Sequence, residues 1–222
     1  MDSPGKLEKA AMEQAELEQA GLEQANLERA ALTAAQAFVA GHADTSIQRF
    51  TDNVMSWGEE QIAVPSAHLP VSETFMAAES DMPDLTALMA PFKAMAKSAR
   101  WEQSYRQADG LVGDDMLAGY GFIELVGKLG PFVSNKVRLG VGAWGPHIKY
   151  PAHHHAAEEI YLVLAGSAWF ELEGDAPAQR AAGDVVYVRP SRVHALHTRD
   201  EPVVVFYLWQ GGELRERSTF TT

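Results

Sequence analysis

The sequence of 222 residues contains no cysteine. This absence excludes disulfide scaffolds, cysteine-ligated zinc, iron–sulfur clusters and thiol nucleophiles. Positive charge is also scarce, because 18 Lys and Arg stand against 30 Asp and Glu and give a formal net charge of −12. An acidic chain without a basic cluster binds nucleic acids and anionic lipids poorly. We therefore expect no nucleic-acid partner.

Long apolar runs are missing as well. No run reaches the roughly 18 apolar residues that a membrane-spanning helix needs. The first residues, MDSPGKLEKAAMEQ, lack the apolar segment of a secretory signal. We therefore expect a cytoplasmic protein without a membrane partner. The apolar fraction of 46% and the charged fraction of 22% are those of a globular protein.

The first 100 residues read as helical. Residues 6–40 are rich in Ala, Glu, Gln and Leu and repeat every five residues. A step of five residues turns about 500° around a helix, so the repeated leucines form no single stripe. The spacing also resembles a pentapeptide repeat, which winds a β-helix in long arrays, but so few units make little more than one coil. We predict a helix over 6–40 and further helices over 45–57 and 84–99, where Pro91 would kink the helix or mark a boundary.

From residue 101 onward, short β-rich runs alternate with turn residues. The runs are WEQSY (101–105), YGFIELV (120–126), SNKVRLGVGAW (134–144), EEIYLVLAG (158–166), SAWFELEG (167–174), DVVYVRP (184–190) and PVVVFYLW (202–209). Many short strands without crossover helices indicate a sandwich or barrel rather than a parallel sheet. We predict a mainly β fold, with a helical region over 1–100 and one barrel over 101–222.

Histidines gather in the barrel region. Six of the eight lie between residues 147 and 197, in an acidic chain where histidine is the commonest metal ligand. Strand alternation puts His153 and His155 on one face, and after a tight turn Glu159 and Tyr161 share a face. On a hairpin, two imidazoles and a carboxylate supply three ligands for a divalent metal, and a fourth can come from a distant strand.

The spacing of these residues resembles the two cupin motifs. The first, His-x-His-x3-Glu-x6-Gly, falls at His153, His155, Glu159 and Gly166, and the second falls at Gly183, Pro190 and His194. The resemblance implies a cupin barrel that binds one divalent transition metal (Fe(II), Mn, Zn, Co or Ni) through His153, His155, Glu159 and His194. His147 stands at the usual first-motif glycine, and Thr198 replaces the usual asparagine. His154 and His197 have the opposite strand parity, so we expect them outside the ligand set.

The wider segment YPAHHHAAEEIYLVLAGSAWF, between YGFIELVG and FYLWQGG, resembles the cupin-type dimethylsulfoniopropionate (DMSP) lyases, in particular the L-type and Q-type enzymes. The resemblance covers about residues 100–210. These carbon–sulfur lyases cleave DMSP to dimethyl sulfide and acrylate. It implies that Tyr161 is the catalytic base, that Tyr150 is a second catalytic tyrosine, and that Tyr120, Trp209 and Tyr150 line the substrate pocket.

The chemistry of β-elimination agrees with these residue types. A metal that holds the substrate carboxylate would neutralise charge as the proton on the adjacent carbon is removed. Tyr161 shares a face with Glu159, so its oxygen can approach the metal, and a nearby cation lowers the pKa of a phenol. The sulfonium cation favours aromatic faces. Candidates for this contact, each with barrel packing as the alternative, are Tyr120, Tyr150, Trp169, Phe206 and Trp209.

Two alternatives to a lyase stay open from the residues alone. Another metal-dependent cupin enzyme, a dioxygenase or an isomerase, has the same ligand types. A non-catalytic cupin that binds a small molecule is the other, although it would have no need of Tyr161 beside the metal. A requirement for oxygen would distinguish a dioxygenase from a lyase, because an elimination proceeds without oxygen. A homodimer is also consistent with a cupin.

Overall fold

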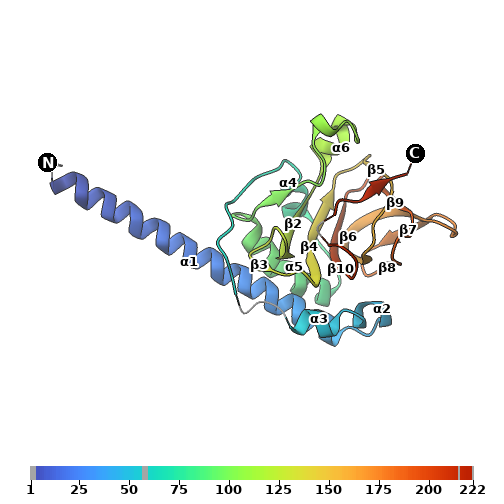
Figure 1. Ribbon diagram of the computed structural model, residues 1–222, viewed down its shortest axis with the longest axis horizontal. Coiled ribbons are helices and arrows are strands. Elements are labelled where there is room, and N and C mark those ends of the chain that lie inside the picture. The colour runs from blue at the N-terminus through green and yellow to red at the C-terminus, as the bar shows by residue number, and fades with distance from the viewer. Residues whose placement is uncertain (1–3, 57–59, 215, 222) are drawn as a thin grey trace.

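The computed structural model describes residues 4–56, 60–214 and 216–221 (Figure 1). Helices occupy the N-terminal part, and an antiparallel sheet curled into a half-barrel follows. This arrangement confirms the predicted fold class of a cupin barrel behind an N-terminal helical region. No helix in the described ranges is long and apolar enough to cross a membrane.

The five-residue repeat lies within one helix, α1 (Pro4–Gly41). Its N-terminal half projects away from the rest of the molecule (Figure 1). There Leu17 and Leu22 are 69% and 62% exposed, whereas Leu32, at the same place in the repeat, is 4% exposed. The repeat itself therefore does not decide burial. Contact with the body of the protein does, because the leucines spiral around the helix and only its last turns meet a partner.

Further helices lie between α1 and the second strand of the sheet. They are α2 (Thr45–Gln48), α3 (Thr51–Met55), α4 (Ser72–Ala77), α5 (Pro83–Ala96), the 3-10 helix η1 (Gln107–Asp109) and α6 (Asp114–Gly119). The predicted helix over 45–57 is two short helices, the first capped by Asp44, and its residue 57 lies outside the described residues. Helix α5 continues through Pro91, so this proline does not end the helix.

The strands pair in the order β1-β2-β4-β10-β6-β9-β5-β11, with β3 on β2 and with β7 and β8 on β6. Their bounds are β1 (Trp101–Glu102), β2 (Tyr120–Gly127), β3 (Phe132–Val133), β4 (Val137–Trp144), β5 (Lys149–His154), β6 (Glu158–Leu172), β7 (Ala178–Ala181), β8 (Val185–Val188), β9 (His194–His197), β10 (Val203–Gln210) and β11 (Thr219–Phe220). The two runs predicted over 158–174 are the single long strand β6. Its first part pairs with β10 and β8, and its last part pairs with β7 and β9.

The predicted hairpin around residues 153–159 is wrong. Within the described chain β5 pairs with β9 and β11, whereas β6 pairs with β10, β8, β7 and β9. The short connection at residues 155–157 therefore carries the chain from one part of the half-barrel to another. A short connection does not by itself fix strand pairing, because the pairing also depends on partners far away in sequence.

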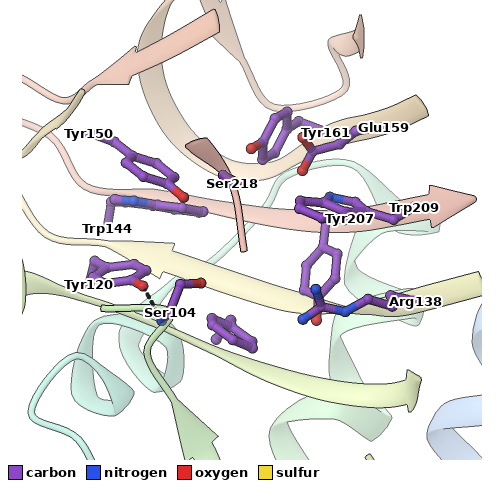
Figure 2. A pocket seen from close by; sticks show the side chains of 11 residues that line it. Ser104, Tyr120, Arg138, Trp144, Tyr150, Glu159, Tyr161, Tyr207, Trp209 and Ser218 are labelled. Atoms are coloured by element: carbon purple, nitrogen blue, oxygen red, sulfur yellow. Dashed lines mark hydrogen bonds between the residues drawn. The ribbon is translucent and has the colours of Figure 1, made fainter. Parts of the chain in front are cut away.

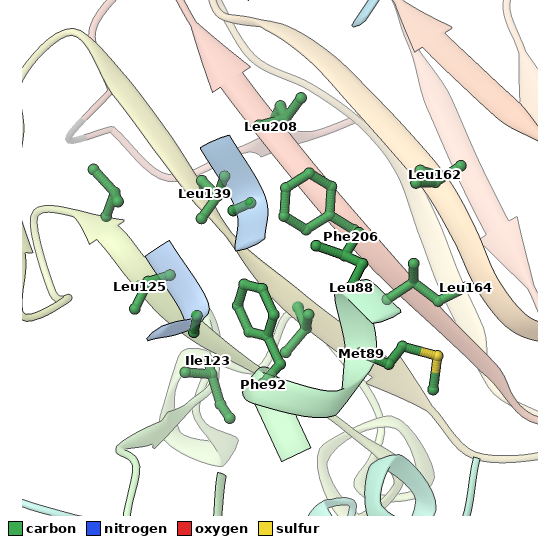
Figure 3. Packing of buried hydrophobic residues seen from close by; sticks show 14 of the residues in the cluster. Leu88, Met89, Phe92, Ile123, Leu125, Leu139, Leu162, Leu164, Phe206 and Leu208 are labelled. Atoms are coloured by element: carbon green, nitrogen blue, oxygen red, sulfur yellow. The ribbon is translucent and has the colours of Figure 1, made fainter. Parts of the chain in front are cut away.

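The two faces of the sheet have different roles. On one face, α1 and α5 pack against strands β2, β4, β6 and β10 (Figure 3). The residues drawn there include Leu88, Met89, Phe92, Ile123, Leu125, Leu139, Leu162, Leu164, Phe206 and Leu208. Along β6, Ile160 and Leu162 join this core, whereas Tyr161 and Val163 belong to the cluster on the concave face. The predicted alternation along β6 is confirmed, and it leaves the concave face free for a site.

Candidate metal centre and active-site pocket

Three buried histidines meet on the concave face. His153 is the penultimate residue of β5, His155 lies in the loop directly after this strand, and His194 begins β9. Their ligand atoms all lie within 4.8 Å of one another. The register of β5 and β9 sets His153 directly opposite His194, so residues about forty positions apart in sequence become neighbours.

Glu159 completes this cluster from strand β6. One carboxylate oxygen, Oε2, lies 2.9 Å from Nε2 of His155 and 3.4 Å from Nε2 of His194. The residue is 2% exposed. The structure therefore brings together the four residues expected to bind metal, from three strands and one loop.

The hydrogen bonds of the three histidines indicate which ring nitrogen of each carries the proton. The Nδ1 atoms of His153, His155 and His194 lie 2.8 to 2.9 Å from the backbone oxygens of Pro151, Ala157 and Arg192 respectively. A carbonyl only accepts, so each Nδ1 carries the proton and each Nε2 turns a lone pair inward. Among the described residues, Nε2 of His194 is buried without a hydrogen-bond partner. Three lone pairs and a carboxylate thus face one another, which is the donor set that fits a divalent transition metal.

The pKa values of His153 and Glu159 indicate the charge that each of these two groups carries. Burial, together with the neighbouring His194, lowers the pKa of His153 to about 3, so this ring is neutral. Burial alone would raise the pKa of Glu159, but hydrogen bonds from His155 and His194 lower that pKa well below its usual range whenever their Nε2 atoms carry a proton. The carboxylate is therefore charged while His153 keeps a free lone pair.

An open pocket adjoins the cluster (Figure 2). Its lining is mainly aromatic and consists of Ser104, Tyr120, Phe122, Arg138, Trp144, Tyr150, Glu159, Tyr161, Tyr207, Trp209 and Ser218. All four aromatic residues expected at the site, Tyr120, Tyr150, Tyr161 and Trp209, are among them. The pocket shares Glu159 with the histidine cluster, so the two are one site.

Aromatic rings contact the histidines directly. Tyr150 stacks on His153 with ring centroids 4.3 Å apart, and Trp209 stacks on His155 at 3.9 Å. The ring of Tyr161 lies 6.2 Å from that of His194. These contacts place two phenols and an indole at the edge of the candidate metal centre.

The tyrosine hydroxyls are held in the protonated form. Burial raises the pKa of Tyr120 to about 12. Burial also raises the pKa of Tyr150 well above its ordinary value, with further contributions from Tyr105 and Tyr120. The pKa of Tyr161 is raised well above its ordinary value by burial and by the charge of Glu159. Without a cation at the histidines, none of these groups is ionised at neutral pH.

Two aromatic candidates lie elsewhere. Phe206 is on the opposite face of β10, where it packs edge-on against Phe38 and Phe92. Trp169 lies in the second part of β6, under the guanidinium of Arg199, and does not line the pocket. Neither candidate lines the pocket, and for Phe206 the alternative of core packing holds.

His154 and His197, which have the opposite strand parity, lie outside the cluster, and so does the loop residue His147. His197 lies 3.2 Å from Glu171, and His147 is exposed and 3.7 Å from Asp200. His147 has a φ of 60°, a conformation that the glycine usual at this motif position adopts more readily.

Sequence reasoning missed several residues of the pocket. Tyr207 follows the same alternation as Trp209 on β10, and this signal could have found it. It is the cross-strand partner of Tyr161 on β6 and of Gly140 on β4. Its hydroxyl is buried and has no hydrogen-bond partner among the described residues. Ser104 and Ser218 come from irregular segments, for which the sequence carries no pattern.

The curled sheet and the inward-facing histidines are those of a cupin. Residues 41–205 match the family described as dimethylsulfoniopropionate lyase, and the chain therefore belongs to this family of carbon–sulfur lyases. It is 36% identical over 138 residues to dimethylsulfoniopropionate lyase DddQ of Ruegeria pomeroyi, an alignment that covers 60% of this chain and 67% of DddQ.

Solved structures agree with the family assignment. The crystal structure of DMSP lyase DddQ from Ruegeria pomeroyi superimposes with a TM-score of 0.75 and 28% identity, covering 87% of this chain and 96% of that one. A crystal structure reported for the DMSP lyases RdDddP and RnDddQII gives a TM-score of 0.78 and 27% identity, covering 90% of this chain and 100% of that one. The similarity thus extends into the helical region.

Proposed function

We propose that this protein cleaves DMSP to dimethyl sulfide and acrylate by a metal-dependent β-elimination. The observation that carries the proposal is the buried set of three Nε2 lone pairs and one carboxylate beside an aromatic pocket. His153, His155, Glu159 and His194 would hold the metal. Family membership supports the substrate.

The pocket suits both ends of a sulfonium carboxylate. When bound, a divalent cation would hold the substrate carboxylate and neutralise the charge that builds there. It would also offset the charge of Glu159, which adds to burial in keeping Tyr161 protonated. The faces of Tyr120, Tyr150 and Trp209 attract the sulfonium group, with about 0.5–2 kcal/mol for each good contact. The hydroxyl of Tyr207 offers a further hydrogen-bond donor to the substrate.

Tyr161 is the base that this arrangement favours. It stands two residues from Glu159 on the same face of β6 and beside the ring of His194. As phenolate it takes the proton from the carbon next to the carboxylate. The carbon–sulfur bond then breaks, the double bond of acrylate forms, and dimethyl sulfide leaves as a neutral molecule that needs no general acid. Tyr150 is the second candidate, with its hydroxyl 3.4 Å from that of Tyr105.

The test is dimethyl sulfide in the headspace after DMSP is added to protein loaded with Fe(II), Mn, Co, Ni or Zn. We expect equal release in air and without oxygen. Tyr161→Phe should keep its metal and lose about 10²–10⁴-fold in turnover, the usual contribution of a general base. The matched variant Tyr150→Phe shows which phenol acts.

Each other outcome has a definite meaning. No release with any of the five metals would contradict DMSP cleavage, and release only in air would favour oxygen-dependent chemistry. Full activity in Tyr161→Phe, with loss in Tyr150→Phe, would move the base to Tyr150.

A further inference from the structure

A buried ion pair lies at the wall of the pocket. Nε and Nη2 of Arg138, on β4, both lie 2.6 Å from Oε2 of Glu124, on β2. The other carboxylate oxygen accepts the backbone N–H of Leu129. The side chains of Glu124 and Arg138 are only 1% and 15% exposed. Because the desolvation of two charges offsets most of their attraction, such a pair is weak evidence for stability, and its position suggests another role.

The pair contacts the active site through Trp209. The guanidinium of Arg138 lies over the indole ring, 5.0 Å from its centroid. In the sheet, Trp209 is the direct cross-strand partner of Arg138 on β4 and of Glu159 on β6 (Figure 2). The same indole stacks on His155 with an interplanar angle of 26°. A continuous set of contacts therefore runs from Glu124 through Arg138 and Trp209 to His155.

We propose that Glu124 and Arg138 are positioning residues that fix the ring of His155 by holding Trp209 against it. This inference rests on the proposed function, because it assigns His155 to the metal. The ring of His155 is then held at Nδ1 by the oxygen of Ala157 and on its face by Trp209. Groups that orient a metal ligand from outside the coordination sphere contribute strongly to metal affinity.

The carboxylate of Glu124 also makes Arg138 compatible with the substrate. An unpaired guanidinium in the pocket wall would repel a sulfonium cation. Glu124 balances that charge, so Arg138 can hold Trp209 while the pair brings no net charge to the pocket. A neutral side chain would avoid the repulsion but would lack the cation–π contact with the indole.

The chain offers a matched control on the opposite face of the sheet. Arg49 lies over the ring of Tyr187 at 5.6 Å, and its guanidinium is 2.9 Å from the carboxylate of Glu158. This trio has the same chemistry as Glu124, Arg138 and Trp209, but it contacts none of the histidines of the cluster. Arg49→Met therefore removes an equivalent contact without reaching the site.

The test compares Zn²⁺ affinity, measured by competition with a chelator, in the full-length wild type and in Glu124→Gln/Arg138→Met. The double change leaves no unpaired buried charge. We expect a loss of about 10-fold to 100-fold in Zn²⁺ affinity, the usual effect of removing an outer contact of a ligand. Arg49→Met should bind Zn²⁺ as the wild type does.

A double-mutant cycle separates positioning from general damage. In a Trp209→Leu background, Glu124→Gln/Arg138→Met should cause no further loss, because its effect passes through the indole. Wild-type affinity in the double variant would overturn the inference, and so would an undiminished loss in the Trp209→Leu background. Should the double variant fail to fold, Arg138→Lys keeps the ion pair but not the planar stacking. It should weaken Zn²⁺ binding several-fold, and wild-type affinity there would also overturn the inference.

The two proposals can fail separately. A wild type that binds Zn²⁺ but releases no dimethyl sulfide with any metal contradicts the proposed activity, while the affinity comparison still tests the positioning role. A wild type that is active, with a double variant of equal Zn²⁺ affinity, contradicts the positioning role alone.

Discussion

Glu158 and Glu159 are neighbours on β6 that point to opposite faces of the sheet. On the helix side, the carboxylate of Glu158 accepts from the hydroxyl of Tyr187 at 2.6 Å, from Nε2 of Gln210 at 2.7 Å and from Arg49 at 3.0 Å. On the concave side, Glu159 meets the Nε2 atoms of histidines whose protons are on Nδ1. One carboxylate is surrounded by donors and the other by acceptors.

This difference separates structural from functional polar groups. Burial alone would raise the pKa of Glu158, but hydrogen bonds from Tyr187, Gln210 and Arg49 hold it below its usual value. The chain thus satisfies Glu158 with its own side chains. The cluster around Glu159 lacks a positive centre, and a buried polar group without a partner in a folded protein calls for an explanation. A bound cation is the explanation that the donor types favour.

The largest effect is expected from Glu159→Gln, which tests the comparison of the two glutamates directly. The amide keeps the shape of the side chain but removes the negative charge, so we expect metal occupancy and dimethyl sulfide release both to fall to background. Elemental analysis after gel filtration measures the metal. Full occupancy would remove Glu159 from the ligand set.

A smaller effect is expected from Tyr207→Phe. Its hydroxyl has no partner within the described residues, so its removal should leave the melting temperature unchanged or raise it. If the hydroxyl donates to the substrate, KM should rise about 2- to 10-fold, which corresponds to one neutral hydrogen bond. Thermal melts and steady-state kinetics check the two parts. A lower melting temperature with an unchanged KM would give Tyr207 a structural role only.

The smallest effect on activity is expected from Glu158→Gln. It makes the same change from Glu to Gln as in Glu159→Gln, but on the helix side of β6. The substitution weakens the contacts of Glu158 with Arg49 and Tyr187. We expect the melting temperature to fall by roughly 2–6 °C, while metal occupancy and turnover stay at the wild-type level. Loss of metal in this variant would contradict the separation between the two faces of β6.

The fold was predictable wherever the signal is local. Composition indicates the helix over residues 6–40, and alternation places Tyr161 and Leu162 on opposite faces of one strand. Alternation also places Tyr207 on the same face as Trp209, so Tyr207 could have been predicted as a pocket residue, but only Trp209 was. The homodimer and the cytoplasmic location stay predictions.

The other differences from the sequence analysis are one long-range pairing, one overlooked strand parity and one irregular segment. Residues 153–159 have the spacing of a hairpin, yet β5 pairs with β9 because the chain crosses between parts of the half-barrel there. Phe206 is as aromatic as Trp209, but it has the opposite parity on β10 and faces the core. Ser218 reaches the pocket from the C-terminal segment, which carries no periodic pattern.

The sequence by itself determined the kinds of ligand atoms and their faces, because residue type and strand alternation are local properties. His153, His155 and Glu159 could be selected on that basis, whereas His194 was implied by the resemblance to the second cupin motif. Only the tertiary structure decided that β9 lies beside β5, that backbone oxygens turn three Nε2 lone pairs inward, and that Arg138 and His155 share one indole. These features depend on strands far apart in sequence that meet only when the sheet curls, and no local spacing encodes such a meeting.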